Sequence, residues 1–138
     1  MSMEYWSEEG YGFPLFNEDN FDKVVDFIVK YENYNETKTT DIKECKKDWE
    51  LNEVIGEPVS CVVANIINRI EEVSLLAGYD CCGETKQEQM IGVVKFFPWQ
   101  INKNQLINLQ ETNEILNKYA KVLGIKKEPD YFTAKYFG

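Results

Sequence analysis

The sequence predicts an α+β fold, a single domain in which a small antiparallel sheet of about four strands is packed by three main helices. Three stretches repeat apolar residues with the period of an α-helix, and shorter apolar runs of the kind found in strands lie before, between and after them. This order is typical of helices that cover one face of a small sheet. A chain of 138 residues suits one domain with one core, so we expect residues 1–138 to fold as a unit.

The first predicted elements are an extended segment and a helix. Residues 5–16 mix aromatic residues with glycines, which indicates a strand interrupted by a turn, and Pro14 would confine that strand to an edge or an end of the sheet. Asn17 is a suitable N-cap for a helix over about residues 18–32. The apolar stripe of this helix consists of Phe21, Val24, Val25, Ile28 and Tyr31.

Residues 33–56 are polar and irregular, which indicates a long loop or a loop that contains one short helix near residues 41–50. Ile42, Cys45 and Trp49 are spaced three and four apart, and this spacing favours the short helix. A long loop in a compact domain is also a place where functional residues are often found.

The strongest helical pattern follows Gly56, and Pro58 suits its first helical position. We expect this helix to be central to the core, with Ile66 and Ile67 buried. Its continuous apolar stripe consists of Val59, Val62, Val63, Ile66, Ile67, Ile70 and Val73.

The last third of the chain predicts two strands, a helix and a final strand. Short apolar runs at residues 74–79 and 90–97 predict an antiparallel pair joined by a polar loop. A third helix is expected to start at Asn102 and to stop at Gly124. Alternation over Tyr131–Phe137 predicts a last strand, whose exposed edge would be able to pair with a second copy and give a homodimer.

The residue types present exclude several kinds of site. The chain has no histidine, which removes the commonest general base and metal ligand, and Arg69 is its single arginine. Four cysteines, Cys45, Cys61, Cys81 and Cys82, show no C-x2-C spacing of a zinc site. We therefore expect no metal, no cofactor and no catalytic residue, and we interpret the cysteines as buried or half-buried thiols, with a redox role for adjacent Cys81 and Cys82 left open.

The formal net charge of −9 is concentrated in the N-terminal part of the chain. Residues 1–60 hold 15 acidic and 6 basic residues, whereas residues 61–138 hold nine of each. An acidic surface repels nucleic acid and attracts basic proteins, and aromatic residues among the acids are suited to anchor such a partner. The predicted partner-binding residues are Trp6, Glu8, Glu9, Tyr11, Glu18, Asp19, Asp22 and Asp26.

These features indicate a small acidic protein–protein interaction module, an inhibitor that binds a basic nucleic-acid-handling protein. In size, acidity and lack of motifs the chain resembles anti-CRISPR proteins and other phage counter-defence proteins, although no motif carries this resemblance. An immunity protein or antitoxin that neutralises a basic toxin would need the same acidic surface. A third alternative is a small-ligand binder or enzyme with a site built from tyrosine, lysine and carboxylates, which would have a deep pocket.

The sequence also predicts where the protein works. No apolar run approaches the roughly 20 residues that span a bilayer. The first residues lack the basic and apolar regions of a signal peptide. A cytoplasmic location is therefore expected, in the host cytoplasm if a phage encodes the protein, with no membrane and no direct nucleic-acid contact.

Overall fold

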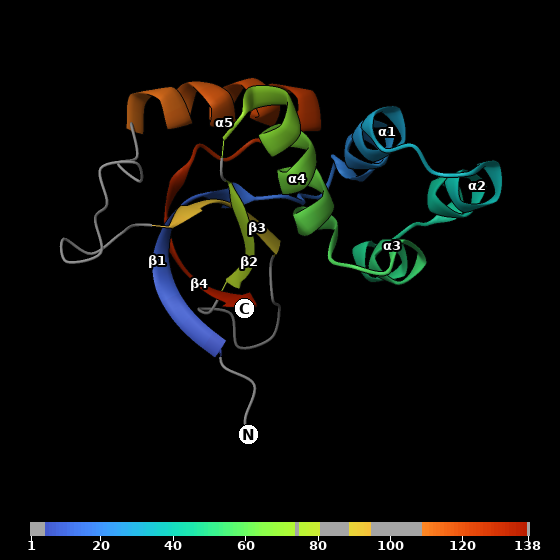
Figure 1. Ribbon diagram of the computed structural model, residues 1–138, viewed down its shortest axis with the longest axis horizontal. Coiled ribbons are helices and arrows are strands. Elements are labelled where there is room, and N and C mark those ends of the chain that lie inside the picture. Colours follow the sequence, from blue (N-terminus) through green and yellow to red (C-terminus); the bar gives the residue numbers. More distant parts are fainter. Residues whose placement is uncertain (1–4, 74, 81–88, 95–108, 138) are drawn as a thin grey trace.

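The computed structural model describes residues 5–73, 75–80, 89–94 and 109–137. Figure 1 shows a sheet that is curled on itself, with helices at one end and to one side. In chain order the described elements are β1 (Tyr5–Pro14), α1 (Phe21–Tyr31), α2 (Glu36–Glu44), α3 (Asp48–Ile55), α4 (Val59–Glu71), β2 (Leu76–Asp80), β3 (Gln89–Val94), α5 (Leu109–Leu123) and β4 (Asp130–Phe137).

The four strands form a closed barrel in the order β1-β3-β2-β4, and every described pair is antiparallel. Strand β1 is long enough to serve two neighbours, because Tyr5–Gly12 pairs with β4 while Gly10–Pro14 pairs with β3. Strand β2 pairs with β3, as the two apolar runs predicted, and at Tyr79 and Asp80 it also meets β4. Closure therefore joins strands from the two ends of the described chain.

The predicted arrangement, a small sheet packed by three main helices, is wrong. The described part of the chain has five helices, which hold more residues than the strands, and the four strands close instead of presenting a face to be covered. The expected free edge at Tyr131–Phe137 is also absent, because β4 pairs with β1 on one side and, at Ala134 and Lys135, with β2 on the other. Closing a sheet removes its edges, which is one way that proteins avoid edge-to-edge association.

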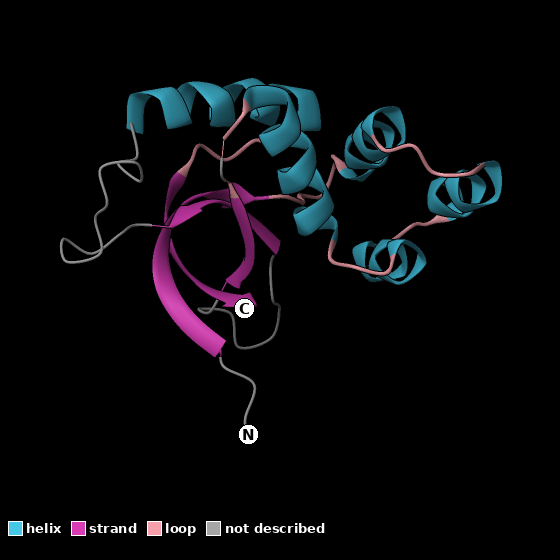
Figure 2. Cartoon of the chain, in the orientation of Figure 1, coloured by secondary structure: helices cyan, strands magenta, loops and turns pink. Residues whose placement is uncertain are grey.

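The helices fall into two groups around this barrel. Helices α4 and α5 lie over one end of it, and α1, α2 and α3 lie to the side beyond α4 (Figures 1 and 2). Helix α4 links the two regions, since it contacts β2 and β3 as well as α1 and α3. We refer to residues 18–57, which contain α1, α2 and α3, as the helical lobe.

One hydrophobic core holds the helices together, and it continues into the end of β1. Ile66 and Ile67 of α4 are fully buried, as predicted, and Phe13 and Leu15 enter the same cluster from the end of β1. Burial of one large aliphatic side chain contributes about 1.5–3 kcal/mol, so this shared cluster is the main stabilising link between barrel and helices.

Helix α1 begins later than predicted. Its N-cap is Asn20, not Asn17, and the Asn20 side chain does not cap the helix. Instead, Asn20 Nδ2 donates to the carbonyl oxygens of Leu15 at 2.7 Å and Leu123 at 2.9 Å. The side chain of Asn17 also turns to the end of α5, where Nδ2 donates to Gly124 O at 2.9 Å. The asparagines therefore fasten α1 to α5.

Residues 33–56 form two helices rather than a loop with one short helix. Asn35 caps α2 by accepting a hydrogen bond from Lys38 N at 2.8 Å, and the chain becomes extended at Cys45 before α3 begins. Ile42 and Cys45 are buried, as their spacing suggested, but the break at Cys45 turns Trp49 outward.

Helix α4 matches the predicted pattern closely, with two differences at its ends. Pro58 is the N-cap rather than the first helical residue, and Asn52 Oδ1 accepts from Val59 N at 2.9 Å. Ile70, expected in the stripe, is exposed. From the last turn of α4, Asn68 bonds both the N–H and the carbonyl oxygen of Leu75, which ties the helix to the residue that precedes β2.

Gly124 ends α5 with a positive φ of 68°, as predicted from the sequence. The predicted start of this helix at Asn102, the strand residues 95–97, and Cys81 and Cys82 lie outside the described residues. Within the described residues, no helix is long and apolar enough to cross a membrane.

Candidate functional site: the acidic helical lobe and its cavity

The structure separates the predicted partner-binding residues into two groups. Glu18 and Asp19 lie just before α1, and Asp22 and Asp26 lie one turn apart on it; all four are exposed. Trp6, Glu8, Glu9 and Tyr11 lie instead on β1, within the barrel. The eight residues therefore do not form one continuous helical surface.

The β1 group is built into the sheet. Trp6, Glu8 and Glu9 pair through their backbones with Tyr136, Ala134 and Thr133 of β4. Tyr11 is half-buried, and its hydroxyl donates to Asn113 Oδ1 of α5 at 2.6 Å. Tyr11 therefore links the barrel to α5.

Asp19 differs from its acidic neighbours because it is ion-paired. Lys126, which follows α5, donates to Asp19 Oδ2, and this hydrogen bond together with the lysine charge lowers the pKa of Asp19. Its charge is balanced within the fold, so Glu18, Asp22 and Asp26 are left as the acids of this group available to a partner.

The acidic surface extends over the whole helical lobe, which holds twelve acids and six lysines. Ten of the acids are exposed, and Asp19 and Glu32 alone among the twelve form an ion pair with another described residue. The twelve acids are Glu18, Asp19, Asp22, Asp26, Glu32, Glu36, Asp41, Glu44, Asp48, Glu50, Glu53 and Glu57.

Trp49 is a surface residue that the sequence interpretation missed. Its spacing from Ile42 and Cys45 suggested that it faced inward, yet it is 56% exposed in the first turn of α3. Asp48 and Glu50 flank it in the sequence. A tryptophan between two acids was the available signal, because large aromatic residues left exposed among charged residues often anchor protein interfaces.

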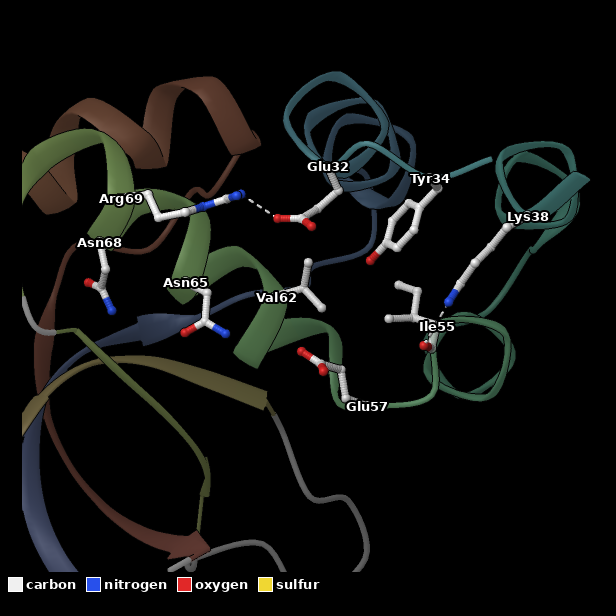
Figure 3. A pocket seen from close by; sticks show the side chains of 9 residues that line it. All are labelled: Glu32, Tyr34, Lys38, Ile55, Glu57, Val62, Asn65, Asn68 and Arg69. Carbon is white, nitrogen blue, oxygen red and sulfur yellow. Dashed lines mark hydrogen bonds and ion pairs between the residues drawn. The ribbon is translucent and has the colours of Figure 1, made fainter. Parts of the chain in front are cut away.

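A cavity of about 710 Å³ lies between α4 and the helical lobe (Figure 3). It is open to solvent, and the sequence analysis did not foresee it because its walls come from four separate segments. The lining residues are Glu32, Tyr34, Lys38, Ile55, Glu57, Val62, Asn65, Asn68 and Arg69.

The two basic side chains of this cavity are already engaged. Lys38 Nζ donates to Ile55 O at 3.2 Å and lies 4.8 Å from the centre of the Tyr34 ring. Arg69 forms an ion pair with Glu32 across the gap between α4 and the end of α1, as Figure 3 shows.

Burial and two acidic residues together raise the pKa of Tyr34. Burial is the largest cause that raises the pKa of its hydroxyl, and the charges of Glu32 and Glu57 raise it further. In Figure 3 the hydroxyl of Tyr34 and the carboxylate of Glu57 both point into the cavity. Among the described residues, neither group has a hydrogen-bond partner, and the same holds for the amide of Asn65.

The described cysteines have the environment of structural thiols. Cys45 is buried and Cys61 half-buried, and burial is the largest cause that raises the pKa of each. A raised pKa keeps a thiol protonated and unreactive near neutral pH. Within the described part of the chain, no group of three or more cysteine or carboxylate side chains could hold a metal ion.

Comparisons of the chain with family models, curated proteins and solved structures found no match.

Proposed function

We propose that this protein is an interaction module that binds a basic protein through its acidic helical lobe, and that it inhibits a nucleic-acid-handling partner by occupying the partner's binding groove. The observation that carries this proposal is the state of the twelve lobe acids. Ten of them are exposed, and all except Asp19 and Glu32 are without an ion pair to a described residue. Charges left unpaired on a surface act on a partner, because pairing within the fold would cancel their field.

The arrangement of the lobe supports both steering and anchoring. Asp22 and Asp26 stand on an outer face of α1, where they attract a basic surface before contact. Trp49 supplies exposed apolar area, and buried aromatic residues provide much of the affinity of protein interfaces. A groove that binds phosphates presents lysines and arginines, which complement this combination. An immunity protein that neutralises a basic toxin would use the same contacts and is the runner-up within this class.

The test measures binding of a short arginine-rich peptide and release of a fluorescent DNA duplex from it. We expect the protein to bind the peptide and displace the duplex. The double variant Asp22→Lys/Asp26→Lys should associate about tenfold more slowly and show a flatter dependence on salt. The matched control is Glu114→Lys/Glu128→Lys, which makes the same change in net charge at exposed positions outside the lobe.

Circular dichroism must accompany the double variant, because Asp22 also stabilises the first turn of α1. Trp49→Ala should accelerate dissociation, with a loss of about 2 kcal/mol of binding free energy if Trp49 is an anchor. Equal slowing by the two double variants would mean that net charge alone governs association, and the lobe would not be the binding surface.

A second candidate function, binding of a small ligand, is supported by the cavity. It brings together Tyr34, Lys38, Glu32 and Glu57, the tyrosine, lysine and carboxylate types that the sequence favoured for such a site. This candidate and the first are compatible, because the cavity opens between α4 and the helical lobe.

A further inference from the structure

We infer that the cavity between α4 and the helical lobe binds a compact organic cation, a guanidinium or alkylammonium group, through Glu57, Glu32 and the Tyr34 hydroxyl. Where that cation is an arginine or lysine side chain of the protein partner, the inference rests on the proposed function. A free small molecule that carries the same group would use the same contacts.

The hydrogen-bonding groups that remain free determine the ligand chemistry. Lys38 Nζ contacts Ile55 O and Arg69 pairs with Glu32, so Glu57 is the one charged residue of the lining that has no described hydrogen bond or ion pair. The Glu57 carboxylate accepts only, and the Tyr34 hydroxyl and the Asn65 amide can each accept. A ligand group that contacts Glu57 must therefore donate, and a cationic donor gains most because hydrogen bonds between charged groups are the stronger kind.

The charges in the cavity favour a cation over an anion. Glu32 and Glu57 both act on the Tyr34 hydroxyl, whereas Lys38 lies over the ring of that residue. An anion that approached Lys38 or Arg69 would also be repelled by the unpaired carboxylate of Glu57. A cation meets Glu57 directly and leaves the Arg69–Glu32 pair in place.

The size and apolar lining of the cavity fit a side chain rather than a simple ion. Ile55 and Val62 supply apolar surface beside the carboxylates, and the methylene stems of arginine and lysine pack on such surface while their heads stay polar. A volume of about 710 Å³ lies within the range of small-molecule sites. This space admits a complete side chain together with part of its backbone.

The experiment uses two blocked amino acids that differ in charge. N-acetyl-arginine amide carries the guanidinium as its single charge, and N-acetyl-citrulline amide is nearly its neutral isostere. Nuclear magnetic resonance titration of the full chain should show shifts of the Asn65 side-chain amide and of the Glu57 backbone with the arginine compound alone. Affinity should be weak, with a Kd of about 1 mM, because the entropy lost on association offsets most of the few contacts that one small group can make.

Variants locate the binding. Glu57→Gln should weaken binding about fivefold, since the carboxylate is exposed and its attraction is partly screened. Glu53→Gln, which removes the same charge from an exposed site on α3 outside the lining, should leave the Kd unchanged. Tyr34→Phe keeps the ring beside Lys38 and should weaken binding about twofold through loss of the hydroxyl.

The arginine-rich peptide of the previous test separates the two sources of the cation. A larger effect of Glu57→Gln than of Glu53→Gln on peptide binding supports a partner side chain in the cavity, because both are lobe acids and only Glu57 lines the cavity. Binding of blocked arginine without any peptide effect at Glu57 supports a free small cation and removes the link to the proposed function. Equal binding of citrulline and arginine compounds, no binding of either, or equal effects of Glu57→Gln and Glu53→Gln would overturn the inference.

Discussion

Asn20 shows how much one buried polar residue can organise. Its side chain is 1% exposed and makes three hydrogen bonds, one of them accepted from Asn17 N at 2.7 Å. The sequence could not predict this role, because Asn17 and Asn20 are both plausible caps by local rules. The partner that decides between them is Leu123 at the end of α5, which is 103 residues away in sequence.

Replacement of Asn20 by aspartate should be strongly destabilising. Asn20→Asp keeps the shape but removes both N–H donors and places a carboxylate against the carbonyl oxygens of Leu15 and Leu123. We expect a loss of about 3 kcal/mol in the free energy of unfolding, measured by urea denaturation. Asn33→Asp at an exposed position is the control, and a similar small effect of both substitutions would contradict this role.

At the scale of elements, the length of the apolar pattern decided what could be predicted. Helices α1 and α4 were predictable because several buried residues repeat along each of them. Helix α2 buries Ile42 alone, and α3 buries only Leu51 and Ile55, so neither shows a period in the sequence. The same limit hid the exposure of Trp49.

Helix α4 allows a matched test of its buried face. Ile66 is 0% exposed and Ile70 is 45% exposed, one turn apart on the same helix. Ile66→Ala should lower the free energy of unfolding by about 2–4 kcal/mol through lost burial and a cavity, and Ile70→Ala by less than about 1 kcal/mol. Chemical denaturation of the two variants measures both values. If Ile66→Ala left the free energy of unfolding nearly unchanged, the buried face of α4 would have to lie elsewhere on the helix.

At the scale of the whole molecule, strand closure was beyond sequence prediction. Alternating residues predict a strand, but nothing local to β1 or β4 specifies that they pair with each other. The acidic character of the N-terminal part, by contrast, followed directly from counting charges. Counting charges could not show that the predicted partner-binding residues divide between β1 and the region of α1. That division depends on the pairing of β1 with β4, which is a contact between distant parts of the chain.

Acid should destabilise the molecule partly through Glu71, which holds α4 to α5. Lys118 Nζ donates to Glu71 Oε1 at 2.6 Å, and the Tyr119 hydroxyl donates to the same oxygen at 2.8 Å. These hydrogen bonds lower the pKa of Glu71 below its ordinary 4.5. The Glu71 carboxylate therefore binds a proton more readily in the unfolded chain than in the folded protein. The contribution of Glu71 to stability is therefore full above about pH 4.5 and is lost as pH falls through the lower, folded-state pKa.

Thermal unfolding across pH checks this expectation. Glu71→Gln should lower the Tm at neutral pH, and the gap to the unmodified protein should close in acid, where that protein has lost the charge as well. Glu72→Gln is the control, because the Glu72 carboxylate is exposed and makes no described contact. A constant gap at every pH would show that the charge of Glu71 is not what links the helices.

The pairing of β1 with β4 also has a consequence during synthesis on the ribosome. Strand β1 is translated early, yet its neighbour over Tyr5–Gly12 is translated only after all the helices. Residues 5–9 pair with β4 alone, so their backbone groups have no partner strand until β4 is made. Contacts so distant in sequence form slowly, and unpaired strands are prone to aggregate. The nascent chain therefore keeps residues 5–9 unpaired until β4 is made, and a chaperone that binds extended segments would recognise them.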